Sequence, residues 1–199
     1  GIYRPLTLGA DISIIAITKY IAGHSDLLMG SVTGNARCAE LLWRAANLLG
    51  QTVTADDAYT ALRGLRTAHA RLKMQAANVM DVIKWLQQQP EVERVLYPAL
   101  ETDPNYALWK RDFNGANSLF SVAFKPAVTA AHTHKFIDSL KMFGIGASWG
   151  GYECLALTYP LDRLKGWTGG SLIRLHVGLE DPVDVIADLQ LGFDAIRVK

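Results

Sequence analysis

Residues 11–18 (DISIIAIT) are the feature that most constrains the fold. The run is short, nearly continuously apolar and rich in isoleucine, a pattern typical of a strand buried on both faces, as in a parallel sheet. Lys19 follows it directly. An ammonium group lies poorly beside an apolar interior unless it is paired, neutralised or covalently bound. The run therefore predicts a buried strand that ends at a lysine. Its position alone favours an ordinary strand-end lysine over one with a special role.

Strand and helix patterns alternate along the rest of the chain. Strands are predicted at residues 27–33, 92–97, 118–124 and 172–177, and helices at 35–49, 56–88, 128–143 and 182–196. The last helix has the clearest start, because Asp181 can cap it and Pro182 fits its first turn. Its apolar stripe is predicted to consist of Val183, Ile186, Leu189, Phe193 and Ile196. The alternation indicates an α/β fold.

Residues 56–88 are predicted to form one long helix or two in sequence. Gly64 lies inside this region, where a glycine costs about 1 kcal/mol relative to alanine. It predicts a kink or a domain boundary. A chain of 199 residues can form one large domain or two small ones. We place the boundary at Leu65, which gives domains of residues 1–65 and 66–199, the second a small α/β layer domain.

Composition argues against several classes of protein. With 20 basic and 19 acidic residues the net charge is +1, which gives no electrostatic reason to expect nucleic acid or an anionic membrane as partner. No apolar run approaches the roughly 20 residues of a membrane span, and a secretory pattern is lacking, so we expect a cytoplasmic protein. Cys38 and Cys154 are far apart, which suggests two core residues and neither a disulfide framework nor a metal site. The chain opens at Gly1 without an initiator methionine and reads as if cut from something longer.

A longer motif surrounds Lys19. It reads Asp11-Ile12-x-x-x-Ala16-Ile17-Thr18-Lys19-Tyr20-Ile21-x-Gly23-His24-Ser25. This motif resembles the attachment signature of the pyridoxal-phosphate (PLP) enzymes of cysteine and methionine metabolism. The resemblance implies an α/β protein of fold type I (aspartate-aminotransferase-like), in which residues 1–65 end the large PLP-binding domain and the small C-terminal domain follows.

The resemblance also implies roles for the residues of the motif. Lys19 would hold PLP as a Schiff base and then act as the free base that moves the Cα proton, which requires a primary amine. Thr18 would hydrogen-bond the cofactor phosphate. Ala16 stands at the cofactor-site position where many members carry a second phosphate-binding serine, so that contact is absent. By residue type alone, His24 could be a metal ligand or an acid/base group, but with no second ligand nearby a structural hydrogen-bonding role is favoured.

A second motif, residues 148–153 (SWGGYE), has paired glycines that let the backbone pass close to another group. By pattern alone, Trp149 could be a core tryptophan in a turn. The motif resembles the active-site loop of the bacterial cystathionine β-lyases of this family, whereas γ-synthases and γ-lyases usually carry leucine in place of Trp149. Family members often have a tyrosine before Ser148, and this chain has Ala147, so the role of that tyrosine is not carried over.

A third motif lies in the predicted strand at residues 172–177. Alternation puts Arg174 and His176 on one face of the strand. We expect this face to be exposed to solvent or to bind a ligand. Spacing alone leaves open a surface arginine on an edge strand. The matching family segment carries the arginine that grips the substrate α-carboxylate with its planar fork, and Ser148 and the Trp149 backbone would assist Arg174.

The resemblance implies that part of the enzyme is missing from this chain. In the family, the N-terminal half supplies the aspartate that pairs with the pyridine nitrogen, the tyrosine that stacks on the ring and most of the phosphate-binding loop. The chain alone is therefore expected to be inactive. The whole enzyme would be a homotetramer that converts the sulfur amino acid L-cystathionine to homocysteine, pyruvate and ammonia.

Two alternatives stay open at this point. The first is a γ-lyase or γ-synthase of the same family, which would act on the same class of sulfur amino acids but give cysteine and 2-oxobutyrate in the lyase case. The second is a non-catalytic fragment that acts only in assembly.

Overall fold

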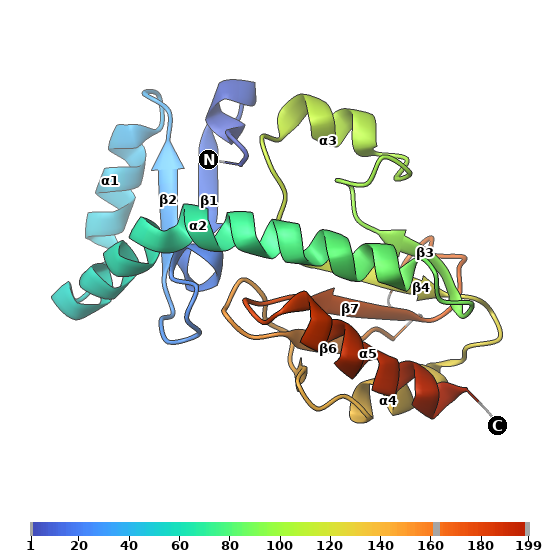
Figure 1. The fold of residues 1–199 in the computed structure, drawn as a ribbon. Coiled ribbons are helices and arrows are strands. Elements are labelled where there is room, and N and C mark those ends of the chain that lie inside the picture. The colour runs from blue at the N-terminus through green and yellow to red at the C-terminus, as the bar shows by residue number, and fades with distance from the viewer. Residues whose placement is uncertain (1, 161–163, 198–199) are drawn as a thin grey trace.

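The computed structural model describes residues 2–160 and 164–197 (Figure 1). In chain order the elements are η1 (Pro5–Leu8), β1 (Ile12–Ala16), η2 (Ile17–Ile21), β2 (Gly30–Gly34), α1 (Ala39–Leu48), α2 (Ala55–Leu86), β3 (Val92–Leu96), α3 (Tyr106–Asp112), β4 (Leu119–Phe124), α4 (Ala130–Asp138), β5 (Gly144–Ile145), β6 (Leu155–Thr158), β7 (Leu172–His176) and α5 (Pro182–Ile196). The short elements η1 and η2 are a 3-10 turn and a π-helical turn. Among the described residues, no helix is both long and apolar enough to span a membrane.

The core lies between a five-stranded sheet and three helices. The strand order is β3-β4-β7-β6-β5, with antiparallel neighbours except for the parallel pair β5 and β6. Figure 1 shows α2 and α5 running across one face of this sheet. Fully buried side chains from both layers form one cluster that includes Val79, Ile83, Phe124, Phe136, Ile173, Leu175, Leu189 and Phe193. The α/β fold predicted from alternation is confirmed.

The helix α5 shows how closely sequence pattern and structure agree where a cap is present. The Asp181 side chain accepts a hydrogen bond from the Val183 backbone N–H at 2.8 Å, and Pro182 occupies the first turn. Leu189, Phe193 and Ile196 are buried as predicted, while Val183 is 71% exposed and Ile186 only half-buried. In the first turn of the helix, Val185 is the buried apolar residue, whereas the predicted stripe had Val183 there.

The prediction for residues 11–18 is wrong in two respects. β1 pairs with β2 in antiparallel register, with Ile14 opposite Val32, in a sheet of two strands. It is also not buried: Ile12, Ile14 and Ile15 are 43%, 77% and 46% exposed. The physical reason is that, in the described part of the chain, no third strand joins this sheet and too little packs over it.

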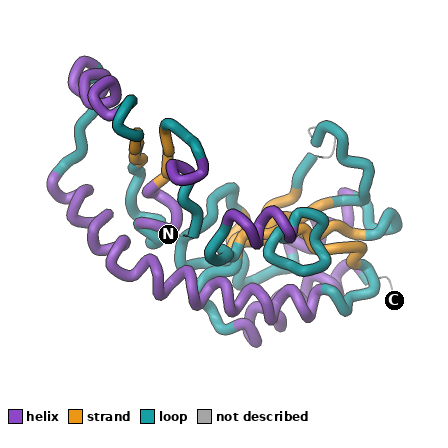
Figure 2. Tube along the Cα trace, turned by 90° about the horizontal axis from the view of Figure 1, so that it is seen from above, coloured by secondary structure: helices purple, strands orange, loops and turns teal. Residues whose placement is uncertain are grey.

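The prediction of a kink at Gly64 is also wrong. α2 runs without a break from Ala55 to Leu86 and, seen from above in Figure 2, extends from beside α1 along the molecule. Gly64 serves close packing instead: a Cβ there would lie 2.5 Å from the backbone oxygens of Ile21 and Ala22. The boundary at Leu65 stays a prediction, since it falls inside a continuous helix.

Several element ends differ from the predicted ones. α1 begins at Ala39 and is preceded by a turn in which the Asn35 side chain accepts from the Arg37 backbone N–H and the Asn35 carbonyl accepts from the Ala39 N–H, each at 3.0 Å. α4 ends at Asp138, and the N–H groups of residues 141–143 instead donate to the buried Asp188 carboxylate.

The short elements η1, α3, β5 and β6 were not predicted. Cys154 is buried as expected, whereas Cys38 is only half-buried.

Candidate functional site

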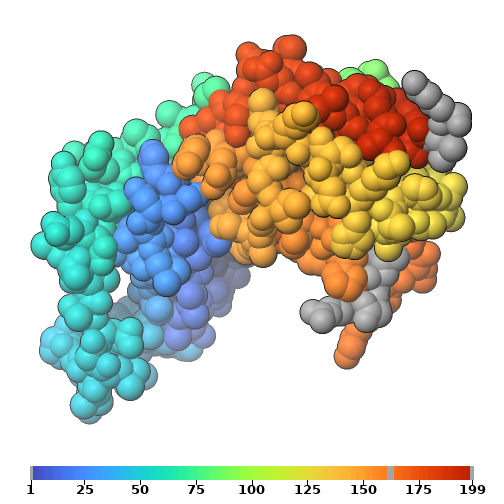
Figure 3. All heavy atoms as spheres, turned by 90° about the horizontal axis from the view of Figure 1, so that it is seen from below, coloured from blue at the N-terminus to red at the C-terminus, as the bar shows by residue number. Residues whose placement is uncertain are grey.

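Lys19 lies in the η2 turn, directly after β1, and faces a loop that is far away in sequence. Its Nζ donates a hydrogen bond to Ser148 Oγ at 2.8 Å and lies 4.5 Å from the centre of the Trp149 ring. Figure 3 shows the N-terminal segment, in blue, bordering the loop before β6, in orange. The structure therefore brings together the first two sequence motifs.

The paired glycines explain why this loop can come so close to Lys19. Gly150 has a φ of +79°, and a Cβ on it would lie 2.8 Å from the Tyr20 nitrogen and 3.0 Å from the Lys19 carbonyl carbon. A side chain is therefore excluded by both backbone conformation and space. The next carbonyl, of Gly151, accepts a hydrogen bond from Gln75 Nε2 of α2 at 2.8 Å, which ties the loop to the long helix.

Arg174 of β7 reaches the same tryptophan. Its guanidinium carbon lies 5.4 Å from the centre of the Trp149 ring, and it donates to Tyr159 Oη at 3.0 Å. Longer contacts of 3.4 Å reach the carbonyl oxygens of Gly146 and Ser148. Within residues 2–160 and 164–197 no carboxylate forms an ion pair with this half-buried side chain. The third motif thus joins the first two, and both cations adjoin one aromatic ring.

His176 is a site residue whose place the sequence did not predict. It shares a face with Arg174, but it is buried, 1% exposed, so the prediction of a wet or liganded face holds only at Arg174. Its Nε2 accepts a hydrogen bond from the Gly150 backbone N–H at 3.0 Å, and its Nδ1 lies 3.1 Å from Ser118 Oγ. Burial lowers the pKa of His176 to about 4, so the imidazole is neutral at pH 7 and able to accept. Alternation alone could identify its face but not the loop that covers it.

Three further motif residues, Ala16 and Thr18 before Lys19 and His24 after it, have their own contacts. The Thr18 hydroxyl donates to the Met29 carbonyl at 3.1 Å and accepts from the Met29 N–H at 2.8 Å, so a contact to a phosphate would require its hydrogen to turn away from Met29. Ala16 ends β1 and offers no side-chain donor. His24 Nδ1 lies 2.6 Å from the Ala22 carbonyl, which confirms its structural hydrogen-bonding role.

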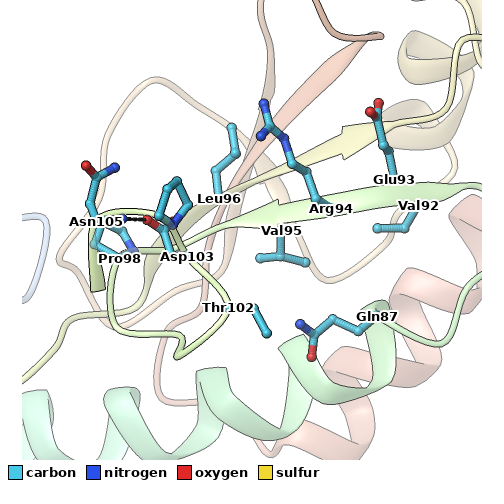
Figure 4. A pocket seen from close by; sticks show the side chains of 11 residues that line it. Gln87, Val92, Glu93, Arg94, Val95, Leu96, Pro98, Thr102, Asp103 and Asn105 are labelled. Atoms are coloured by element: carbon cyan, nitrogen blue, oxygen red, sulfur yellow. Dashed lines mark hydrogen bonds between the residues drawn. The ribbon is translucent and has the colours of Figure 1, made fainter. Parts of the chain in front are cut away.

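Two hollows lie outside the cluster of Lys19, Ser148, Trp149 and Arg174. The smaller, of about 650 Å³, is lined by β3 and the segment of residues 98–105, where Asp103 accepts from the Asn105 backbone N–H (Figure 4). The larger, of about 960 Å³, is mainly apolar and lies between β1, α3 and residues 97–99. Tyr20 lines it, and burial raises the pKa of this phenol to about 12. Lys19, Ser148 and Arg174 line neither hollow.

Comparison with known proteins identifies the class. The family model described as Cys/Met metabolism PLP-dependent enzyme matches residues 1–194. The chain belongs to this family of PLP-dependent enzymes.

Individual relatives carry different names. The cystathionine beta-lyase of Bordetella avium is 48% identical over 199 residues, covering 97% of this chain and 50% of that protein. The L-alanine/L-glutamate racemase of Wolbachia pipientis wMel is 42% identical, covering 94% and 48%. The crystal structure of cystathionine gamma synthase from Xanthomonas oryzae pv. oryzae superposes with a TM-score of 0.88 at 32% identity, covering 98% of this chain and 52% of that one. The chain thus spans about half the length of the relatives it matches.

The residues present fit part of a PLP site. Lys19 offers a half-buried primary amine whose hydrogen-bond partner is the neutral Ser148 hydroxyl. Lys19 and Arg174 adjoin the same ring, and the described residues place no carboxylate in an ion pair with either. This donor set suits an anionic ligand that carries an aldehyde or a carboxylate.

Proposed function

We propose that this chain is the C-terminal half of a PLP-dependent carbon-sulfur lyase that converts L-cystathionine and water to homocysteine, pyruvate and ammonia. The observation that carries the proposal is the cluster of Lys19, Ser148, Trp149 and Arg174, in which the lysine Nζ lies 2.8 Å from Ser148 Oγ and 4.5 Å from the Trp149 ring. The match to cystathionine beta-lyases along nearly the whole chain supports it.

Each side chain has a task in the proposed reaction. Arg174 would bind both oxygens of the substrate α-carboxylate, because a guanidinium fork matches that geometry and fixes the orientation of Cα. The Ser148 hydroxyl, with the Trp149 backbone, would assist and would orient the Lys19 amine. Lys19 would take the proton from Cα once its nitrogen is free and neutral. Bound PLP supplies the electron sink that makes this proton removable.

The proposed reaction is an α,β-elimination, with breakage of the bond between Cβ and sulfur. Trp149 favours it over the γ-reactions, whose enzymes usually carry leucine there. The γ-lyase and γ-synthase activities remain the second candidate, supported by the likeness to the Xanthomonas cystathionine gamma synthase. A racemase is among the relatives, so products and the configuration of recovered substrate both need to be measured.

The proposal includes a partner that completes the site. The N-terminal half of the enzyme would supply the contacts to the pyridine ring and most of those to the phosphate, with Thr18 as the phosphate contact from this chain. The exposed isoleucines of β1 support a partner surface there. We further propose a homotetramer in the cytoplasm as the working form, and we expect the isolated chain to be inactive.

Mass spectrometry after incubation with PLP and borohydride tests the proposal. Reduction fixes any Schiff base, so we expect a phosphopyridoxyl adduct on Lys19 in the wild type and none at position 19 in Lys19→Arg. The same spectrum reports every chain that copurifies, including an N-terminal half. A Lys19 that stays unmodified while surface lysines react would reject the catalytic hypothesis and favour a fragment that acts only in assembly.

Product analysis then separates the lyases. With the complete protein, L-cystathionine should yield pyruvate and homocysteine, at a rate at least about 100-fold lower in Arg174→Ala, because the lost charge-assisted hydrogen bonds are worth several kcal/mol. Formation of cysteine and 2-oxobutyrate would instead support the γ-lyase. Racemised alanine without any cleavage would support the racemase activity named for the Wolbachia relative.

A further inference from the structure

Arg71 of α2 is a buried cation whose surroundings are unusual. It is only 6% exposed, and in the described part of the chain no carboxylate forms an ion pair with it. Burying an unpaired charge is costly unless its hydrogen-bonding groups are satisfied. The site therefore needs an explanation in terms of what the guanidinium binds.

The guanidinium binds backbone carbonyls and one hydroxyl. Its Nη1 donates to Tyr20 O at 2.9 Å, and its Nη2 donates to Ile21 O at 3.0 Å and to Gly64 O at 2.7 Å. Its Nε donates to Thr67 Oγ1 at 3.1 Å. One planar fork thus joins two carbonyls of η2 to the backbone of α2.

The carbonyls of Tyr20 and Ile21 are the last two of the turn that carries Lys19. Carbonyls at the end of a helical turn lack partners within the turn and carry partial negative charge, so a cation placed there stabilises it. The turn has few bonds of its own at this end: Ala22 N–H donates to Ile17 O and Gly23 N–H to Lys19 O, each at 2.8 Å. The contact with Arg71 therefore reinforces a short segment next to Lys19.

Two glycines make room for this contact. A Cβ on Gly23, whose φ is +70°, would overlap with Arg71 Nη1. A Cβ on Gly64 would lie 2.5 Å from Ile21 O. Neither overlap could be relieved without moving the guanidinium or the turn. The local sequence thus leaves space for one arrangement of η2, α2 and Arg71.

We infer that Arg71 is a positioning residue for Lys19: by binding the Tyr20 and Ile21 carbonyls it fixes the η2 turn, so that the lysine side chain points at Ser148 and Trp149. The inference rests on the proposed role of Lys19 as the cofactor lysine. It assigns no contact between Arg71 and the cofactor or the substrate. A lysine at position 71 would keep the charge but could not span three carbonyls with a planar fork.

Hydrogen exchange of the purified protein without added cofactor, with all chains that copurify, is the first test. In Arg71→Gln and in Arg71→Lys we expect the Ala22 and Gly23 amides to exchange at least about tenfold faster, since bonds to a charged group are lost. Amides of α5 should keep wild-type rates. The matched control is Arg66→Gln, an exposed arginine of the same helix, which should change neither. A general structural role would raise exchange throughout the chain.

Attachment of PLP at Lys19 is the second readout. With limiting PLP and borohydride, the ratio of adduct on Lys19 to adduct on the exposed Lys73 should fall at least threefold in both Arg71 variants and stay unchanged in Arg66→Gln. Unchanged exchange at Ala22 and Gly23 in folded variants would overturn the inference. If wild-type Lys19 takes no adduct, the proposed function fails, but the exchange result still decides whether Arg71 holds the turn.

If the Arg71 variants fail to fold, the inference can still be tested by a measurement on the wild-type protein. The Nη protons of Arg71, observed by NMR, should exchange with water at least about 100-fold more slowly than those of Arg66, because they are buried in hydrogen bonds. Equal exchange rates for the two arginines would overturn the inference.

Discussion

At the scale of the single residue, His176 links the position of the loop to pH. The imidazole accepts the Gly150 N–H only when it is unprotonated, and the pKa is lowered to about 4, chiefly by burial, with Glu180 raising it and Arg174 lowering it further. In the unfolded chain the pKa returns to about 6.5. The unfolded state therefore binds a proton between these values and the folded state does not, so stability falls as pH drops from about 6.5 to 4.

This linkage predicts the stability profile of a variant. Wild type should lose up to about 3 kcal/mol of unfolding free energy across that window through His176 alone. His176→Gln should lack this component, and the difference between the two profiles, measured by urea denaturation at several pH values, removes the contribution of carboxylates. Parallel profiles for the two proteins would mean that His176 is not buried in its neutral form.

Residue type explains which site residues could be predicted. Lys19, Trp149 and Arg174 are identifiable from sequence because each carries a chemistry that its sequence neighbours make distinctive, and the structure places Lys19 and Arg174 next to the Trp149 ring. His176 and Arg71 were not predicted as site residues because their roles depend on backbone groups brought from elsewhere, Gly150 for one and the η2 carbonyls for the other. No local pattern encodes those contacts.

At the scale of the element, a predicted helix or strand agrees with the structure where local sequence determines it, and differs where tertiary contacts do. α5 has its own cap and stripe and was predicted at its observed bounds. For β1, apolar composition predicts burial on both faces, but it does not determine which segments cover the strand. For Gly64, helix propensity predicts a break, but it takes no account of the close packing against η2.

The same competition predicts the effect of Gly64→Ala. Helix propensity alone would make the variant more stable by about 1 kcal/mol. The added Cβ would meet two backbone oxygens at 2.5 Å, and overpacking of this kind costs about 1–3 kcal/mol or more. We therefore expect a lower free energy of unfolding in urea.

The reverse substitution at an exposed position of the same helix is the matched control. Ala77 is exposed on α2, so Ala77→Gly measures the propensity difference without the packing contribution and should cost about 1 kcal/mol. If Gly64→Ala stabilised the protein by as much as Ala77→Gly destabilises it, propensity alone would account for both changes. That result would refute the packing role of Gly64.

At the scale of the whole molecule, β1 stands out because its apolar side chains are exposed to solvent, whereas such residues are usually buried in a core. Ile14 is 77% exposed although its sequence context is that of a buried strand. We expect Ile14→Glu to change the unfolding free energy of this chain by no more than about 0.5 kcal/mol, as for other exposed positions. In the proposed assembly, however, that carboxylate would be buried against the N-terminal half and would be costly.

Separate expression of the two halves would measure this difference. Copurification and size-exclusion chromatography should show an association at least about tenfold weaker for Ile14→Glu, because a buried unpaired charge costs more than about 1.4 kcal/mol. Val183→Glu is the matched control, since Val183 is 71% exposed but lies on α5, away from β1. Equal weakening by both substitutions would show that added charge, and not the β1 face, is responsible. Weakening by Ile14→Glu alone would place the N-terminal half on β1, next to the turn that carries Lys19.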